Sequence, residues 1–231
     1  MVSPVMASRR ERHRAETRDE IKQLALGQLA GSGPDALSLN AIARQMGVTG
    51  PALYRYFAGR DELLAELVVD AHEDLADTVQ AAAHPGGDRP AEARVRAAAA
   101  AYRDWALSQP HRYRLLYGNI VPADRVPADR VAPAVRRTRA ALRDALAPLV
   151  RAGNPTDGRD QDPTDDPTVG LSRLTVTAWT RWHGVLSLQL GGQFDPAGID
   201  PAALYRAEVD AVLAAARRLG ARRGWSGRPS R

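Results

Sequence analysis

Apolar side chains recur three and four residues apart along nearly the whole chain, and no segment alternates as a half-buried strand does. The clearest stripe lies between breaks at 31–34 and 84–90 and comprises Leu63, Leu64, Leu67, Val68, Ala71, Leu75 and Val79. The spacing predicts an all-α protein of about nine helices. After a first helix through residues 21–29, the expected segments are 38–46, 49–57, a long fourth helix, one ending near 108, 110–117, 133–152, 169–190 and 201–219.

Composition excludes several classes of protein. The 231 residues include no cysteine, which rules out disulfides, cysteine-ligated zinc and thiol catalysis. No window approaches 18 consecutive apolar residues, mean hydropathy is −0.36, and the N-terminus becomes charged before an apolar segment can form. We therefore expect a cytoplasmic protein without a membrane partner.

Positive charge is concentrated at the N-terminal end. Residues 1–60 hold nine Lys and Arg against five Asp and Glu, so they carry +4 of the total +5. A GC-rich genome would explain why Lys22 is the only lysine, but it does not explain why the excess lies at one end. Such a distribution is typical of a segment that meets phosphates.

The second and third expected helices are short and separated by a tight turn at Gly47, which is the pattern of a helix-turn-helix. Ser38 and Thr49 are suitable N-caps, and Pro51 near the start of the third helix loses no needed hydrogen bond. Gly50, Pro51 and Ala52 keep this helix tip small, so its backbone can approach the major groove of DNA closely.

The third helix has two expected faces. Leu53 and Phe57 are four residues apart and point inward, where Ala43 and Val48 meet them. Tyr54 and Tyr56 cannot share that face, so we expect both to turn outward, where their hydroxyls find phosphate oxygens.

Residues from about Thr17 to Leu67, above all SLNAIARQMGVTGPALYRYFAGRDELL, resemble the TetR family of bacterial transcriptional regulators. The combination IA–GV–LY–YF, followed by a basic residue and a helix start, carries the resemblance. It implies a three-helix DNA-binding head, a connecting fourth helix, and a C-terminal body for ligand binding and dimerisation.

The resemblance also implies the residues that contact DNA. Tyr54, Tyr56 and Arg60 match positions that touch phosphate, although the family usually has lysine at position 60 and a serine or asparagine cap where Gly59 stands. Ser38 and Thr49 are expected to donate to phosphate, and Arg44 and Arg55 to add contacts. The base-edge positions are Asn40, Gly50, Pro51 and Ala52, of which Asn40 is a good adenine reader. An ordinary solvated role is the alternative for each side chain.

The C-terminal half is similar to the WHG-type C-terminal domain of one TetR subgroup. The similarity rests on TAWTRWHGVLSLQLGGQF at 177–194, which contains Trp182, His183 and Gly184, and on YRDWALSQPHRYRLLY at 102–117. Two apolar stripes on the last two helices predict a four-helix interface with a second copy. They comprise Leu174, Ala178, Leu186 and Leu190, and then Leu204, Val209, Val212 and Leu213.

A ligand pocket is expected from a group of aromatic residues and one histidine, namely Trp105, Tyr113, Tyr117, Trp179 and His183. Ordinary core packing is the alternative for each aromatic residue. A structural role is favoured for His183, because the sequence offers no cysteine, no second histidine four residues on and no nearby carboxylate. We expect no metal site and no cofactor.

The expected domains are a flexible basic arm at 1–14, a helix-turn-helix domain at 15–62, a ligand-binding and dimerisation domain at 63–219, and a flexible tail at 220–231. Residues 153–168 hold five aspartates and three prolines without an aliphatic residue, which favours a mobile loop over a calcium loop. The tandem copy VPADRVPADR at 121–130 is expected to be a surface loop.

The resulting hypothesis is a DNA-binding regulator that is not an enzyme. It is expected to act as a homodimeric repressor that a small-molecule effector releases from a pseudo-palindromic operator in double-stranded DNA. The alternative is an effector-independent activator or architectural protein. An enzyme using His183 would need a nucleophile, a metal or a phosphate loop, and the sequence contains no such motif.

Overall fold

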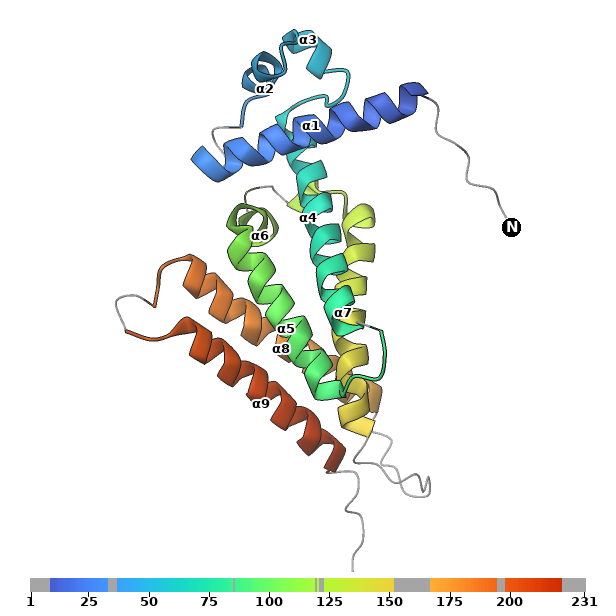
Figure 1. Ribbon diagram of the computed structural model, residues 1–231, viewed down its shortest axis with the longest axis vertical. Coiled ribbons are helices and arrows are strands. Elements are labelled where there is room, and N and C mark those ends of the chain that lie inside the picture. The colour runs from blue at the N-terminus through green and yellow to red at the C-terminus, as the bar shows by residue number, and fades with distance from the viewer. Residues whose placement is uncertain are drawn as a thin grey trace, which may run out of the picture. The chain divides into compact units, whose positions relative to one another are not determined.

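The computed structural model describes residues 9–32, 37–84, 86–118, 120, 123–151, 167–194 and 198–221. Every regular element in these ranges is helical, which confirms the all-α prediction and the expected number of helices (Figure 1). The α-helices are α1 (Arg9–Ser32), α2 (Leu39–Gln45), α3 (Gly50–Leu53), α4 (Arg60–Ala83), α5 (Ala91–Ser108), α6 (Pro110–Tyr117), α7 (Ala128–Arg151), α8 (Pro167–Leu190) and α9 (Pro201–Ala221); η2 (Ala123–Arg125) is a 3-10 helix.

The chain forms two compact units. The first, here called the head unit, comprises residues 1–72 and 109–131, and the second, the body unit, comprises residues 73–108 and 132–231. Two of the three boundaries therefore fall within α4 and α7, the third lies between α5 and α6, and α6 belongs to the head unit. The predicted functional division between 15–62 and 63–219 is a different boundary and stays a prediction.

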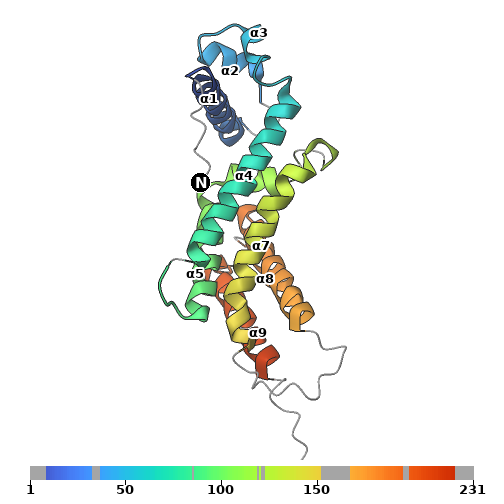
Figure 2. The same cartoon turned by 90° about the vertical axis from the view of Figure 1, so that its right-hand side faces the viewer.

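One apolar core holds the head unit together. It takes side chains from α1, α2, α3, α4 and α6, among them Ile21, Ala25, Leu29, Leu39, Ile42, Leu53, Phe57, Leu63, Leu67 and Leu115. The short α2 and α3 lie side by side in both views, and α2 contacts α1 (Figures 1 and 2). Because neither short helix is stable alone, this shared core fixes their positions.

The turn between α2 and α3 explains why one predicted core residue is exposed. Gly47 has φ +67°, and the Gly47 and Val48 N–H groups donate to the carbonyls of Arg44 and Ala43, which is a Schellman motif. This turn directs Val48 outward, so that 42% of the residue is exposed. The prediction that Val48 joins the core with Ala43 is wrong, whereas Ala43 is buried.

Two helices differ from their predicted bounds. The expected helix at 49–57 is α-helical only to Leu53, because Tyr56 N–H then bonds the carbonyl three residues back, at 2.9 Å, and the chain continues as turns. The second copy of the repeat at 121–130 is not a loop: the Pro127 carbonyl accepts from Arg130 and Val131 N–H, so α7 begins at Ala128.

The described parts of the two expected flexible ends are helical. Residues 9–14 belong to α1, where a flexible arm was expected, and Gly220 and Ala221 end α9. The remainder of the arm and tail, and most of the expected loop at 153–168, lie outside the described residues.

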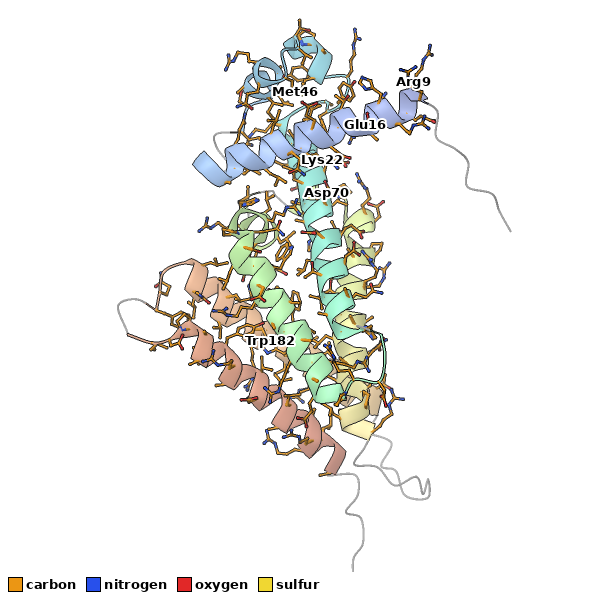
Figure 3. All side chains as sticks on the ribbon, viewed as in Figure 1. Arg9, Glu16, Lys22, Met46, Asp70 and Trp182 are labelled. Carbon is orange, nitrogen blue, oxygen red and sulfur yellow. The ribbon has the colours of Figure 1, made fainter. Side chains whose placement is uncertain are left out.

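In the body unit, α8 packs along α9 and both contact α5. The largest fully buried side chain is Trp182, which lies among these helices (Figure 3). Tyr205 reaches α5, where its hydroxyl donates to the Ala99 carbonyl at 2.8 Å. No helix among the described residues is long and apolar enough to cross a membrane.

The place of α6 in the head core can be tested with Leu115→Ala. Removing this buried leucine should lower the free energy of unfolding by about 2–5 kcal/mol, because it leaves a cavity between α6 and the other helices of the head unit. Urea denaturation followed by circular dichroism measures the change. Leu116→Ala makes the same chemical change at a partly buried neighbour and should cost less; equal losses would contradict the assignment.

Candidate nucleic-acid interface

The start of α2 is fixed to α1 by Ser38. Its N–H donates to Gln28 Oε1 at 2.9 Å, and its Oγ accepts from the Ala41 N–H at 3.3 Å. A serine hydroxyl has one donor and two acceptor positions, so this capping bond leaves the Ser38 O–H able to donate outward.

The predicted DNA-contacting residues gather on α2, α3 and the start of α4. Exposed members are Asn40, Arg44, Thr49, Pro51, Tyr54 and Arg55, and half-buried ones are Ser38, Gly50, Ala52, Tyr56 and Arg60. A Cβ on Gly50 would lie 3.0 Å from Asn40 Oδ1, so the Asn40 amide sits beside the first turn of α3. Within the described chain the Thr49 hydroxyl makes no capping hydrogen bond, which leaves it available to a ligand.

The two tyrosines have different surroundings. Tyr54 is 50% exposed and ends α3, as expected for an outward side chain. Tyr56 is half-buried, packs against the head core and carries the Arg14 guanidinium 5.8 Å from its ring centroid. Tyr56 therefore does not turn fully outward, because the chain leaves the helical path after Leu53.

Two arginines of α1 hold the end of this helix-turn-helix. Arg14 Nη2 donates to the Arg55 carbonyl at 3.3 Å, and Arg18 Nη1 donates to the Tyr56 carbonyl at 2.6 Å. The Arg18 guanidinium also lies 4.2 Å from the Phe57 ring centroid. These residues position the candidate interface from behind, a role that the sequence analysis missed.

Glu66 of α4 connects Arg18 to a third helix. Arg18 Nη2 lies 3.4 Å from Glu66 Oε2, and Arg130 at the start of α7 forms two hydrogen bonds with the same carboxylate. The hydrogen bond from Arg130 lowers the pKa of Glu66 against the opposing effect of burial, and the charges of Arg130, Arg18 and Lys22 lower it further. All of these groups belong to the head unit.

Lys22 makes a parallel connection from α1 to α4. Its Nζ lies 2.8 Å from Asp70 Oδ2 and 3.0 Å from Asp19 Oδ1, and Figure 3 shows Lys22 and Asp70 close together. Hydrogen bonds and charge from these two carboxylates raise the pKa of Lys22, although burial, the largest single effect, acts to lower it. The only lysine of the chain is therefore used inside the fold.

Arg60 is the first residue of α4, after Gly59, whose carbonyl accepts from the Leu63 N–H at 3.2 Å. Its side chain is about two-fifths exposed, and its Nη1 lies 3.9 Å from Asp61 Oδ1. Asp61 is closer to Arg125, at 2.8 Å. Arg60 thus keeps exposed guanidinium surface at the end of the head where α4 begins.

A further group of basic side chains lies on the first turns of α1. Arg9, Arg10, Arg12 and His13 are exposed around a shallow depression that also includes Glu16 (Figure 3). Three arginines against the nearby Glu11 and Glu16 leave this end of the helix positive.

The structure divides the candidate ligand-pocket residues between the two units. Tyr113 and Tyr117 pair in the head unit with ring centroids 4.9 Å apart, while Trp105, Trp179 and His183 belong to the body unit. Trp105 is buried, and its Nε1 donates a hydrogen bond to Asp74 Oδ2 at 2.8 Å. These surroundings are those of an ordinary core residue. The described residues contain no gathering of three or more His, Cys, Asp or Glu side chains that would suit a metal ion.

Around Trp179 and His183 the body unit forms an aromatic cluster. Trp179 stacks on Tyr102 with centroids 4.5 Å apart, and Trp182 lies 6.4 Å from Tyr205. His183 is half-buried, and burial lowers its pKa, so the neutral imidazole is favoured. Sequence reasoning did not single out Tyr102 and Tyr205. Tyr102 lies on α5, the two tryptophans on α8 and Tyr205 on α9, so no regular spacing in the sequence links these residues.

The predicted dimer stripe is used within a single chain. Leu174, Ala178 and Leu186 of α8 are buried, as are Val209, Val212 and Leu213 of α9. These six side chains are therefore covered within their own body unit, whereas Leu190 and Leu204 are half-buried. The predicted four-helix interface between two copies stays a prediction. The exposed apolar residues of α8 are Val169, Val176 and Leu188.

Comparison with family models gives two matches. One described as "Bacterial regulatory proteins, tetR family" matches residues 22–67, and one described as "Tetracyclin repressor-like, C-terminal domain" matches residues 95–212. Neither description specifies the WHG-type subgroup, which stays a prediction.

Relatives cover most of the chain. The HTH-type transcriptional regulator Rv1816 of Mycobacterium tuberculosis is 34% identical over 93% of this chain and 98% of its own length. The HTH-type transcriptional activator FasR of Mycolicibacterium smegmatis is 27% identical over 73% of each chain. The solved structure of putative regulatory protein SCO4313 is 42% identical, with TM-score 0.73 over 90% of this chain and 100% of that one. PfmR of Thermus thermophilus, a TetR family regulator at 19% identity, shares the fold with TM-score 0.57 over 84% of this chain and 97% of its own.

Glu66→Gln tests the ion pairs behind the interface. A carboxyl whose pKa is lowered by folding adds stability above its ordinary pKa, about 4.5, and this stability is lost as pH falls through the folded value. At pH 7 the variant should be less stable by about 1–3 kcal/mol. Below about pH 4.5 the wild type should lose more stability than the variant does.

Urea denaturation at pH 7 and at pH 4 measures both differences. Glu20→Gln, an exposed position on the same helix as Arg18, is the control and should change stability little at either pH. A Glu66→Gln variant with the pH dependence of the wild type would contradict the ion-pair assignment.

Proposed function

This chain belongs to the TetR family of bacterial regulatory proteins and is a transcriptional regulator, and we propose that it acts as a homodimeric repressor released from its operator by a small-molecule effector. The operator is double-stranded and pseudo-palindromic, because a two-fold dimer presents two heads to two half-sites about 34–36 Å apart. The observation that carries the proposal is the exposed face of α2 and α3, held rigidly from behind by Arg14 and Arg18.

Phosphate contacts come from side chains around this face. Thr49 and Ser38 donate hydroxyl hydrogens from the starts of α3 and α2, and Tyr54 donates its exposed phenol. Arg60 supplies positive charge, and the half-buried Tyr56 donates its phenol hydroxyl. Such contacts fix the register of the head on DNA without reading sequence.

Base reading falls mainly to Asn40 and Arg44, both exposed on α2, with Arg55 adding a contact from the end of α3. Gly50, Pro51 and Ala52 lie at the tip of α3 and bring the backbone close to the base edges. Because these three side chains offer few hydrogen-bonding groups, DNA shape contributes to specificity as well.

The exposed apolar residues of α8 support dimerisation. The exposed side of α8 includes Val169, Val176 and Leu188, and Val176 is 55% exposed. Arg173 and Thr180 lie on the same side, because they are three or four residues from Val169 or Val176. Gly184 lies within this helix, and a Cβ there would meet no atom of the described chain within 4 Å, so a second helix can approach closely. We therefore place the interface on this face of α8.

Effector release requires two states of the dimer that bind DNA differently. The head unit includes α6 and the start of α7, and the backbone of α4 and α7 continues into the body unit. A ligand bound in the body, with Trp179 and His183 as candidate contacts, can therefore act on the head through these continuous helices.

Activation is the second candidate function. The observation that favours it is that the relative FasR is named a transcriptional activator. Activation and repression use the same DNA interface and differ in where the operator lies relative to the promoter. The family models and relatives are all regulators, which supports a protein without enzymatic activity.

Binding to the DNA upstream of the protein's own gene tests the function. Tyr54→Ala together with Arg60→Ala should weaken binding at least about tenfold and reduce the slope of log affinity against log salt by about one, because a phosphate contact by an arginine is lost. Fluorescence anisotropy over a salt series measures both. Arg139→Ala, an exposed arginine of α7, is the control. Full binding by the double variant would refute the assigned interface.

The same assay with candidate apolar compounds separates the two functions. A compound that weakens DNA binding, together with transcription in vitro that rises when the compound is added, supports a ligand-released repressor. Transcription that falls when the protein is removed supports an activator instead.

Val176→Glu tests the proposed dimer face. A charge placed in an apolar interface should weaken dimerisation about a hundredfold and lower operator affinity, while the helical signal of the monomer stays unchanged. Analytical ultracentrifugation measures the association. Gln80→Glu adds one negative charge at an exposed position of α4 and should leave the dimer intact. If Val176→Glu dimerises as strongly as the wild type, the interface does not lie on this face of α8.

A further inference from the structure

The first two turns of α1 extend beyond the packed part of the head unit. Every residue from 9 to 16 is exposed, and the first buried side chain of the helix is Ile21. In the view of Figure 1 the start of α1 extends past α2 and α3, and Figure 3 labels Arg9 at this end. The match to the tetR family model begins only at residue 22, so neither core packing nor the family match explains these turns.

These turns carry a positive charge that their own carboxylates do not balance. They hold four arginines and two glutamates. Glu16 lies 3.9 Å from His13, and both side chains are largely exposed, so this pair is weak. Within the described part of the chain, neither Arg9 nor Arg10 pairs with a carboxylate. An excess of positive charge therefore faces the solvent.

The arginines stand where a helix is least stabilised by them. The first turn of a helix favours acidic side chains, because its free N–H groups make that end partially positive. The α1 helix begins instead with Arg9 and Arg10, and Arg12 follows in the same turn. An anionic partner explains this placement better than the stability of the helix does.

The same face of α1 leads to the proposed DNA interface. Arg10, Arg14 and Arg18 follow one another at intervals of four residues, so they lie along one side of the helix. Arg18 donates to the Tyr56 carbonyl at 2.6 Å. One turn earlier, Arg14 donates to the Arg55 carbonyl at 3.3 Å. Arg10 lies a further turn, about 5.4 Å, along the axis, so its long side chain extends beside the segment that ends the helix-turn-helix.

The side chains of these turns suit a phosphate backbone rather than an apolar partner. Ala15 is the only apolar residue between positions 9 and 16, so the turns offer no apolar face to a protein groove or to the acyl chains of a membrane. A guanidinium binds phosphate through paired N–H groups. Such contacts carry no sequence information, because the phosphate backbone is the same at every base pair.

We propose that the start of α1 binds the phosphate backbone of double-stranded DNA through Arg9 and Arg10, beside the site that α2 and α3 contact, with Arg12 adding to the positive charge. The inference rests on the proposed function, since it takes the exposed face of α2 and α3 as the DNA interface. The contact strengthens binding to the operator and to unrelated DNA by a similar factor.

Fluorescence anisotropy over a salt series tests the proposal with two duplexes, the DNA upstream of the protein's own gene and a shuffled sequence of the same length. Arg9→Gln together with Arg10→Gln should weaken binding to both duplexes by a similar factor of at least about ten, and should reduce the slope of log affinity against log salt by about two. Arg136→Gln together with Arg139→Gln removes the same charge from exposed positions of α7 and should leave both affinities unchanged.

Two further measurements separate a phosphate contact from a structural role. Arg9→Lys together with Arg10→Lys keeps both charges and should retain the wild-type affinity within about threefold. Urea denaturation should give the double glutamine variant the stability of the wild type, because residues 9–16 are exposed and contribute nothing to the head core.

The inference and the proposed function fail in different ways. A wild type that binds the upstream duplex no more tightly than the shuffled one contradicts the proposed function at that DNA, whereas a loss of affinity for both duplexes in the double glutamine variant still supports the contact from α1. A folded double glutamine variant with wild-type affinity for both duplexes would overturn the inference alone. A double lysine variant as weak as the glutamine one, or an equal loss in the α7 variant, would also overturn it.

Discussion

The position of the candidate DNA interface depends on the guanidinium of Arg18. This one group donates to the Tyr56 carbonyl at 2.6 Å, covers the Phe57 ring and pairs with Glu66, so it joins the end of the helix-turn-helix to α1 and α4. A lysine could not do the same, because its ammonium is a point charge without a planar face to stack on a ring. The α3 helix has only four residues and cannot be stable alone, so its orientation comes from these external contacts.

Glu66 extends this arrangement to the start of α7. Arg18 approaches the Glu66 carboxylate from α1, and Arg130 approaches it from a segment 64 residues further along the chain. The head unit is consequently not the first third of the chain alone: α6 contributes Leu115 to its core, and η2 contributes Arg125 to Asp61. A change in residues 109–131 would therefore act on the packing that orients α3, rather than on a separate domain.

Sequence patterns predicted the parts of this structure that are governed by local spacing. Gly47 was identified because a left-handed turn needs glycine, and Leu53 and Phe57 because residues four apart share a face. The contacts of Arg14 and Arg18 were not predictable, because they join groups 41 and 38 residues apart through long side chains that leave no periodic signal. The burial of most of the predicted dimer stripe within one chain was not predictable for a related reason: periodicity shows that a helix face is buried, but not whether the same chain or a second copy covers it.

The use of arginine changes how the charge of the N-terminal segment is interpreted. Of its nine basic residues, Arg18 and Lys22 pair with carboxylates inside the head unit, which offset their charges, and Arg14 donates to a backbone carbonyl. The exposed positive charge is concentrated instead on Arg9, Arg10 and Arg12 at the start of α1, and on Arg44 and Arg55 near α3. The net charge of +4 is thus a poor measure of the surface that meets phosphate. What matters is that one set of cations orients the interface, and a second set, on the outside of the same helices, supplies the attraction.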